Sequence, residues 1–383
     1  MKRFRQIFIG VVIVLLLFSA MAYGDTWKPN KMITDTLGDS KYPAMAVDGT
    51  NIYVVWQDTP DLLNEEIYFK RSVDGGVTWK ATRNLSNTTG DSYAPAIAVY
   101  GLNIYVVWQD YTLGNSEIYF KRSEDGGVTW KTTKNLSNNT LGSYNQGIAV
   151  DGSSIYVVWE DYTPLYPDIY FKRSEDGGVT WKTTRNLSNT AAYSNTPAIA
   201  VDGLNVYLVW QDNTPGNFEI YFKKSVDGGV TWTTTKRLTN NAGVSISPAI
   251  AVDGTNIYVV WDDDTPGNSE IYFKKAGDGG AIWTANKRLT KNLGDSKFPS
   301  IAADGSNISM VWHDDTPGNY EIYFKRSVDG GATWTTNKRL TTNELGSMFP
   351  AIAADGSNVY IVWQNFITFP PNFEIYFKKG VLD

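Results

Sequence analysis

The stretch Ser72-Val73-Asp74-Gly75-Gly76-Val77-Thr78-Trp79 recurs along the chain, and we name it the octet. Further copies begin at residues 123, 174, 225 and 327, and a diverged copy at residue 276 has lost the Ser and the Thr. Neighbouring start points are 51 residues apart. A fixed period of this size indicates a stack or ring of identical supersecondary units.

The octet has the composition of a tight turn between two strands. An Asp followed by two Gly supplies positive-φ positions and side-chain-to-backbone bonds, and the Trp anchors the turn on apolar surface. Spelled Ser-x-Asp-x-Gly-x-Thr-Trp, the octet resembles the Asp-box of the bacterial neuraminidase repeat, found in sialidases and other β-propellers. The resemblance implies a sialidase-like β-propeller in which these aspartates are structural and lie away from any active site: Asp74, Asp125, Asp176, Asp227, Asp278 and Asp329.

Each repeat contains four strand-like runs broken by Gly, Pro, Asn and Asp, which is typical of an all-β fold. Residues 248–252, 256–261 and 270–275 represent the first three runs, and residues 129–136 the fourth. The small first run suits a crowded propeller axis, and the apolar middle runs suit strands covered on both faces. All 14 Trp fall into two repeat positions, which indicates packing between repeats.

The two ends of the chain predict how the ring closes. The final repeat stops after its third strand, at residues 373–380, and residues 26–34 align without a gap on the fourth strand at 231–239. An open solenoid would instead need polar capping repeats at both ends. We therefore predict a closed seven-bladed β-propeller with four-stranded antiparallel blades of about 51 residues, whose last blade is completed by the N-terminal strand.

Residues 1–24 differ from the repeats. Three basic residues precede an apolar run at 7–18, and small residues follow it, as in a secretory signal peptide. The alternative is an uncleaved membrane anchor, because the apolar run is a little long. We expect residues 25–383 to form one propeller domain that is secreted or held at the cell surface, with no other membrane segment.

Composition narrows the possible chemistry. The chain has no Cys, which excludes disulfides and thiol nucleophiles, and its one His (His313) leaves no room for a His-based metal site or a Ser-His-Asp triad. Without residues 1–24 the chain carries 31 Lys+Arg against 40 Asp+Glu, a net charge of −9. This balance argues against nucleic acid and anionic lipid as partners.

The loops between the second and third predicted strands share one end of the propeller with the fourth-to-first loops, opposite the octets. An Asp follows the second-strand Trp by two residues in six repeats, and a carboxylate precedes every third strand. Such a ring suits sugar hydroxyls, amines or calcium, whereas the alternative is turn chemistry in which each Asp bonds its own loop. The candidate ligand-binding residues are Asp110, Glu117, Asp161, Asp212, Asn217, Glu219, Asp263, Asn268, Glu270, Asp314, Asn319 and Glu321.

No catalytic or metal-ligating residue is assigned. The sialidase resemblance implies three converging arginines, a Tyr nucleophile with a Glu partner, and an Asp acid/base. The first-strand position that matches an arginine-containing family segment reads Lys41-Tyr42-Pro43-Ala44, without arginine. Arg71 and its repeats precede the octets, and Arg83 and its repeats lie on the outer strand, far from the axis. The acidic loops lack EF-hand spacing, so no cofactor is predicted and Ca²⁺ is the one ion left open.

The sequence therefore predicts an exported, monomeric, non-catalytic binding propeller that recognises a glycan or an extracellular protein through repeated acidic and amide loops. Two alternatives stay open: a sialidase-type glycoside hydrolase, and a structural envelope or adhesion protein. The last repeat departs from the others at residues 365–373, where Phe366, Phe369 and Phe373 are predicted to form a contact patch.

Overall fold

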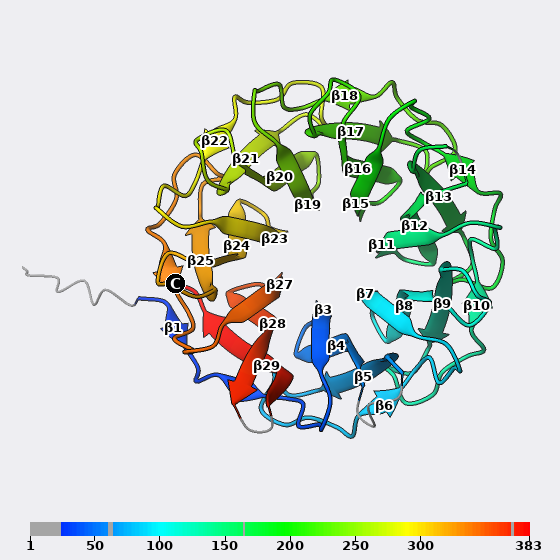
Figure 1. Ribbon diagram of the computed structural model, residues 1–383, viewed down its shortest axis with the longest axis horizontal. Coiled ribbons are helices and arrows are strands. Elements are labelled where there is room, and N and C mark those ends of the chain that lie inside the picture. Colours follow the sequence, from blue (N-terminus) through cyan, green and yellow to red (C-terminus); the bar gives the residue numbers. More distant parts are fainter. Residues whose placement is uncertain (1–23, 60–63, 164, 369–370) are drawn as a thin grey trace, which may run out of the picture.

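The computed structural model describes residues 24–59, 64–163, 165–368 and 371–383. In these residues every regular element is a β-strand, and the strands form seven antiparallel sheets around a central axis (Figure 1). The prediction of a closed seven-bladed propeller is confirmed. The predicted signal peptide lies outside the described residues except for Gly24, and no helix suited to crossing a membrane occurs in the part that is described.

We number the blades along the chain and give the strands of each from the axis outward. Blade one has β3 (Ser40–Asp48), β4 (Asn51–Asp58), β5 (Glu66–Ser72) and β6 (Arg83–Asn84); blade two has β7 (Ser92–Tyr100), β8 (Asn103–Asp110), β9 (Glu117–Ser123) and β10 (Lys134–Asn135). Blade three has β11 (Ser143–Asp151), β12 (Ser154–Asp161), β13 (Asp168–Ser174) and β14 (Arg185–Asn186); blade four has β15 (Ser194–Asp202), β16 (Asn205–Asp212), β17 (Glu219–Ser225) and β18 (Lys236–Arg237). Blade five has β19 (Ser245–Asp253), β20 (Asn256–Asp263), β21 (Glu270–Ala276) and β22 (Lys287–Arg288); blade six has β23 (Ser296–Asp304), β24 (Asn307–Asp314), β25 (Glu321–Ser327) and β26 (Lys338–Arg339). Blade seven has β27 (Ser347–Asp355), β28 (Asn358–Thr368) and β29 (Pro371–Val381), completed by β1 (Thr26–Trp27) and β2 (Lys31–Met32).

The innermost strands are longer than their small apolar runs predict, and each contains a bulge. In β7 the pairing with β8 shifts between Tyr93 and Ala96, and Ala94 has a φ of +48°. A residue before proline normally stays extended, and a non-glycine residue with positive φ is strained. The same left-handed backbone recurs at one position of every blade: Tyr42, Ala94, Asn145, Thr196, Ser247, Phe298 and Phe349.

In blades one to six the outer strands differ from the prediction, because only two residues of each run pair as a strand. In blade two the Lys131 amide donates to the Arg122 carbonyl (2.9 Å), and regular pairing resumes where Lys134 lies opposite Phe120. Between these two points the outer segment advances by three residues while β9 advances by two. The extra residue interrupts the regular hydrogen-bond ladder between the two strands. The Trp predicted to open the fourth strand therefore lies before it.

The octet is held as a turn by its own side chains. The Asp74 carboxylate accepts the amide of Thr78 (2.8 Å) and its hydroxyl, while the Ser72 hydroxyl accepts the Gly76 amide (2.9 Å). The bond from the Thr78 hydroxyl is the main reason that the pKa of Asp74 falls to about 2. Ser, Asp and Thr therefore each have a structural task, as the resemblance implied.

The octet also fastens each blade to the preceding one. Trp130 in blade two packs edge-on against Phe69 in blade one, with ring centroids 5.0 Å apart. Gly127, at a φ of +83°, lies so near that ring that a Cβ atom would come within 2.6 Å of it. The second glycine is therefore required both for the backbone conformation and for the close approach of two blades.

The ring closes through the N-terminal segment, as predicted. Trp27 pairs with Gly380, and Met32 with Tyr376, so β1 and β2 complete the sheet of blade seven. Ile33 is buried in a cluster that contains residues of blades one and seven. Closure thus removes the sheet edge that β29 would otherwise expose.

Replacing Gly127 by alanine tests the role of close blade contact. We expect Gly127→Ala to lower the free energy of unfolding by about 2–4 kcal/mol, since it adds overpacking to an unfavourable φ. Gly152→Ala is the matched control, because Gly152 also has a positive φ (+59°) but has no atom within 4 Å of the added Cβ. The control is expected to cost only about 1–2 kcal/mol. Urea denaturation measures the free energy of unfolding of both variants. An equal loss in the two would contradict a steric role for Gly127.

Candidate functional site

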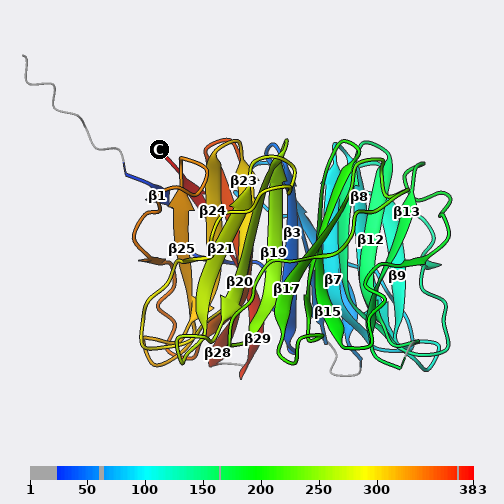
Figure 2. The same cartoon turned by 90° about the horizontal axis from the view of Figure 1, so that it is seen from above.

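The ring has two different ends, which Figure 2 shows above and below the upright strands. At one end each octet bonds the turn between the first two strands, as where the Gly75 amide donates to the Thr50 carbonyl (2.9 Å). At the other end the second-to-third loops bond the fourth-to-first loops, as where the Ser92 amide donates to the Glu65 carbonyl (2.7 Å). We name these ends the octet face and the loop face.

The carboxylates predicted to bind a ligand on the loop face lie beneath its surface. All nine are exposed by 2% or less: Asp110, Glu117, Asp161, Asp212, Glu219, Asp263, Glu270, Asp314 and Glu321. The three amides, Asn217, Asn268 and Asn319, are only partly buried. A ligand at the surface would therefore meet few of the carboxylate oxygens.

The aspartates that end the second strands bond their own blades. Asp212 accepts hydrogen bonds from the Ser194 hydroxyl (2.7 Å), the Trp210 indole NH (3.3 Å) and the Thr214 amide (2.8 Å). Similar bonds hold Asp110, Asp263 and Asp314. This arrangement is the turn chemistry that the sequence left open as an alternative.

The glutamates that begin the third strands join two loops of their blades. Glu219 accepts from the Arg237 guanidinium (2.6 Å), the Asn241 amide (3.0 Å) and the Asn217 side chain (3.3 Å). Asn268 and Asn319 likewise donate to carbonyls of the fourth-to-first loops. The predicted acidic and amide residues thus hold the loop face together, and their hydrogen bonds leave them poorly placed to contact a ligand.

Removing Glu219 should therefore destabilise the blade. Glu219→Ala leaves the Arg237 guanidinium without its buried carboxylate, and we expect a loss of about 2–4 kcal/mol in the free energy of unfolding. Glu344→Ala is the control, because Glu344 is an exposed carboxylate of a fourth-to-first loop. Urea denaturation of both variants provides the measurement, and a Glu219→Ala variant as stable as the control would contradict the structural role.

The main opening of the loop face lies at the axis. The residues before the repeated prolines, with the prolines themselves, line a cavity of about 300 Å³. Its wall is formed by Tyr42, Pro43, Ala94, Pro95, Thr196, Ser247, Pro248, Phe298, Pro299, Phe349 and Pro350. The size is at the lower end of the range for small-molecule sites.

The wall of this cavity is asymmetric although its backbone is repeated. Three adjoining blades contribute Phe298, Phe349 and Tyr42, and Phe349 contacts each of the other two rings at a centroid distance of 4.9 Å. Thr196 of blade four lies across the axis from these rings, and Ser247 of blade five lines the wall beside blade six. The sequence reasoning missed this site, and the signal for it is the identity of the residue before each repeated proline.

The residue that follows each second-strand Trp supports the wall residue of the following blade. The amides of Tyr42 and Ala94 donate to the side-chain carbonyls of Gln364 and Gln57, both at 2.9 Å. The Phe349 amide donates to Nδ1 of His313 (3.2 Å). These bonds satisfy the amides of the strained residues and fix the wall of the cavity.

Two supporting positions carry carboxyls in place of amides. Glu160 accepts the Thr196 amide (2.7 Å), and Asp262 accepts the Phe298 amide (3.3 Å). Burial raises the pKa of Glu160 and raises that of Asp262 to about 7, whereas burial lowers the pKa of His313 to about 4. At neutral pH these groups therefore carry less charge than their usual pKa values would give them.

The raised pKa of Asp262 predicts a pH dependence of stability. Between about pH 4 and pH 7 the folded state binds more protons than the unfolded chain, so the free energy of unfolding falls as pH rises. Asp262→Asn keeps a carbonyl oxygen for the Phe298 amide and removes this titration. Relative to the unchanged protein, the variant should gain about 2–4 kcal/mol between pH 5 and pH 8. Urea denaturation at both pH values checks this, and parallel pH profiles would contradict it.

Part of the predicted phenylalanine patch forms. Phe366 and Phe373 contact edge-on at 5.0 Å, and the Lys41 ammonium lies 5.6 Å from the Phe373 ring centroid. Phe369 lies outside the described residues. Across the described chain, no group of three or more His, Asp or Glu side chains is placed to hold one metal ion.

The arginines lie where the sequence analysis expected them. Arg71 donates to the Gly126 carbonyl of the next octet, and Arg237 pairs with Glu219 near the outer strand. Of the arginines that the structure describes, none lines the axial cavity. The cavity accordingly differs from the arginine-lined site that the sialidase resemblance implied.

The strands and their arrangement around the axis define the chain as a seven-bladed β-propeller. No family model matches the chain. Among solved structures, a PL25 ulvan lyase superimposes with a TM-score of 0.62 at 12% identity, covering 86% of this chain and 92% of the lyase. The phage phi92 endosialidase gives 0.58 at 10% identity (93% and 69% covered), and the Hadza microbial sialidase Hz136 gives 0.55 at 17% (86% and 76%). At these identities the shared property is the fold.

Two curated proteins also resemble parts of the sequence. The xyloglucanase Xgh74A of Acetivibrio thermocellus is 27% identical over 250 residues, which is 56% of this chain and 28% of the xyloglucanase. The TolB homolog of Chlorobaculum tepidum is 36% identical over 108 residues, or 28% of this chain and 21% of that protein. The chain thus spans 28% or less of the length of these relatives.

Proposed function

We propose that this protein is an exported, non-catalytic carbohydrate-binding propeller whose primary site is the axial cavity of the loop face. The observation that carries the proposal is the asymmetric wall, with Tyr42, Phe298 and Phe349 in three adjoining blades and Thr196 in blade four across the axis. A pyranose has an apolar face and a hydroxyl-bearing rim. Such a ring matches an aromatic wall opposite hydrogen-bonding groups.

The charge of the cavity favours a neutral sugar. Its lining includes no carboxylate and no arginine among the described residues. Asp262 and His313 behind the wall are 1% and 2% exposed, so they lie away from the position a sugar would occupy. Cleavage of a glycosidic bond by paired carboxylates requires both to reach the scissile bond, and the cavity presents none. Binding without turnover is therefore the function we infer.

The comparisons support carbohydrate as the ligand class. The relatives and structural neighbours include a xyloglucanase, an ulvan lyase and sialidases, all named for activities on carbohydrates. Export rests on residues 1–24, and a monomeric state rests on the closed ring, whose described blades end in outer strands of only two residues. Recognition through the repeated acidic loops gives way in this proposal to recognition at the axis.

Titration calorimetry with neutral and sialylated mono- and disaccharides tests the proposal. Phe349→Ala should weaken binding about tenfold or more through lost stacking. Its fold should survive, because Ala94 already occupies the equivalent backbone position. Thr196→Val keeps the side-chain shape and removes a hydroxyl, so it should weaken binding by several-fold, about 1 kcal/mol.

Tyr100→Ala is the control, because Tyr100 is 51% exposed on the octet face. This variant should bind as the unchanged protein does. Affinity that is equal in all three variants, or the absence of any sugar binding, would contradict the proposal. Mass spectrometry of the same mixtures would show any released sugar, and a catalytic product would replace the proposal by the hydrolase alternative.

A further inference from the structure

Six tyrosines form a continuous row on the loop face, and none of them lines the axial cavity. Tyr93 and Tyr111 of blade two contact edge-on at 5.7 Å, and Tyr144 and Tyr162 of blade three do so at 5.2 Å. Tyr111 lies close enough to Tyr144 to contribute, after burial, to the raised pKa of the Tyr144 hydroxyl, and it so links the two pairs. We name this set, with the two residues added in the next paragraph, the tyrosine row.

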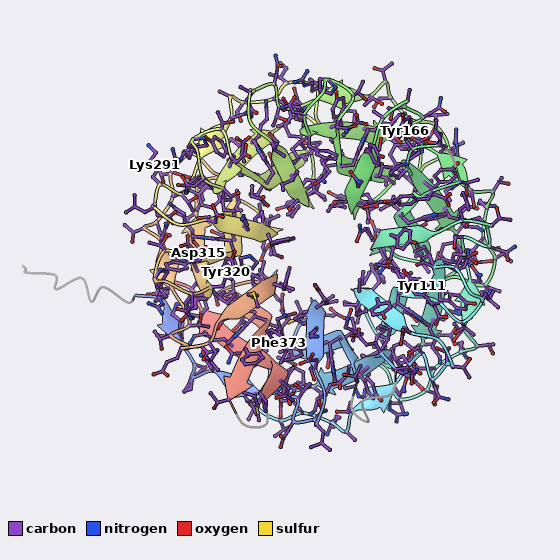
Figure 3. The ribbon with its side chains drawn as sticks, in the orientation of Figure 1. Tyr111, Tyr166, Lys291, Asp315, Tyr320 and Phe373 are labelled. Atoms are coloured by element: carbon purple, nitrogen blue, oxygen red, sulfur yellow. The ribbon has the colours of Figure 1, made fainter. Side chains whose placement is uncertain are left out.

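The row continues into blade four. Tyr193 lies close enough to Tyr162 to raise its pKa, and Tyr166 contacts Tyr193 at 5.2 Å. Tyr162 is 38% exposed and Tyr193 is 43% exposed, so the outer end of the row is open to solvent. In Figure 3, Tyr111 and Tyr166 lie on one side of the ring, whereas Tyr320 and Phe373 lie on the other.

The row is a departure from the repeat. Tyr93 and Tyr144 follow the first Ser of their innermost strands, where the other blades carry Lys41, Asn195, Ile246, Lys297 and Met348. Tyr111 and Tyr162 follow the last Asp of the second strand, where the other blades carry Thr59, Asn213, Asp264, Asp315 and Phe366. Packing of the blades does not require tyrosine at these positions, because four or more blades fold without it.

The row is continuous with the axial cavity. Tyr93 precedes Ala94, which lines the cavity, and Tyr144 precedes the equivalent residue of blade three. From there the row runs around the loop face over blades two and three, to Tyr193 just before β15 of blade four. A chain of sugars that starts in the cavity would therefore meet one tyrosine after another. Aromatic rings with a hydroxyl at the edge provide both stacking surface and hydrogen bonds.

The charges around the row exclude an acidic polymer. Burial raises the pKa of Tyr93, and the nearby carboxyls of Asp91 and Glu65 raise it further. The lysines at the corresponding positions of blades one and six are paired with Asp39 and Asp295, outside the row. Single-stranded nucleic acid also stacks on aromatic rings, but its phosphates need cations along the track.

We infer that the tyrosine row is an extended binding track for a linear, neutral glycan that begins in the axial cavity. The inference rests on the proposed function, because the cavity holds the first sugar. The inference adds the class of ligand, which is a neutral chain longer than a disaccharide. It also predicts that residues outside the cavity make longer chains bind more tightly. Short sugars use the cavity alone, and longer chains use the cavity and the row.

Titration calorimetry of the full chain against cellohexaose, xylohexaose and mannohexaose, with their disaccharides for comparison, tests this inference. At least one hexaose should bind about tenfold more tightly than its disaccharide. Tyr111→Ala combined with Tyr162→Ala should remove this length dependence and leave disaccharide affinity unchanged. The matched double Phe variant keeps both rings and should retain most of it. Tyr100→Ala on the octet face is the control for folding and for loss of an exposed aromatic ring.

Several outcomes would overturn the inference. One is a hexaose that binds no better than its disaccharide, and another is a double Ala variant that keeps the length dependence. Tighter binding of hexagalacturonate, or of a single-stranded oligothymidylate that the double Ala variant fails to bind, would assign the row to an anionic polymer. In each of these cases, loss of disaccharide binding in the Phe349→Ala variant would still support the axial cavity as a sugar-binding site. The absence of all sugar binding would instead contradict the proposed function itself.

Discussion

Closure of the ring is the constraint on which the rest of the structure depends. Each blade buries its faces only against its two neighbours. The seam, which is the interface between blade seven and blade one, must therefore be packed as closely as the other six interfaces. There Trp79 packs edge-on against Phe377 at 5.2 Å, and the Lys31 ammonium donates to the Val77 carbonyl at 2.6 Å. The Tyr42 amide donates to Gln364 across the same seam near the axis. The N-terminal segment therefore fastens the outer rim of this seam, and β3 of blade one closes it near the axis.

Much of the fold was predictable because its signals are local and repeated. An Asp-Gly-Gly turn, a continuous apolar strand and a final repeat that lacks its fourth strand each follow from neighbouring residues. The shortened outer strand and the bulge in the innermost strand were not predictable in this way. Both depend on how one strand shifts against its partner, as between Tyr93 and Ala96, and spacing along a single strand does not record that shift.

The carboxylates that the sequence predicted as ligand-binding lie on the loop face, where they are buried and bonded to neighbouring segments. Asp212 and Glu219 lie at the ends of strands, as predicted. Several of the groups that donate hydrogen bonds to them come from distant parts of the sequence. Asn241 lies 22 residues beyond Glu219 in sequence and bonds it through the backbone amide. A carboxylate at a loop reads the same in sequence whether it faces solvent or a neighbouring loop, and only the fold decides between the two.

In a repeat protein, functional residues are best sought at positions where the residue differs between repeats. The octets, the buried Trp and the carboxylates recur because every blade needs them, so their recurrence from blade to blade reports packing. Two sets of positions are free of that demand. At the first, aromatic residues occupy blades six, seven and one (Phe298, Phe349 and Tyr42), and at the second, tyrosines occupy blades two and three, with Tyr166 and Tyr193 of the adjoining loops extending the row. These sectors are complementary around one axis, so a single ligand can meet stacking surface first in the cavity and then along the row. Seven identical sites would fix neither a starting point nor a direction for a bound chain. A path with a direction on a symmetric ring therefore needs residues that differ between blades.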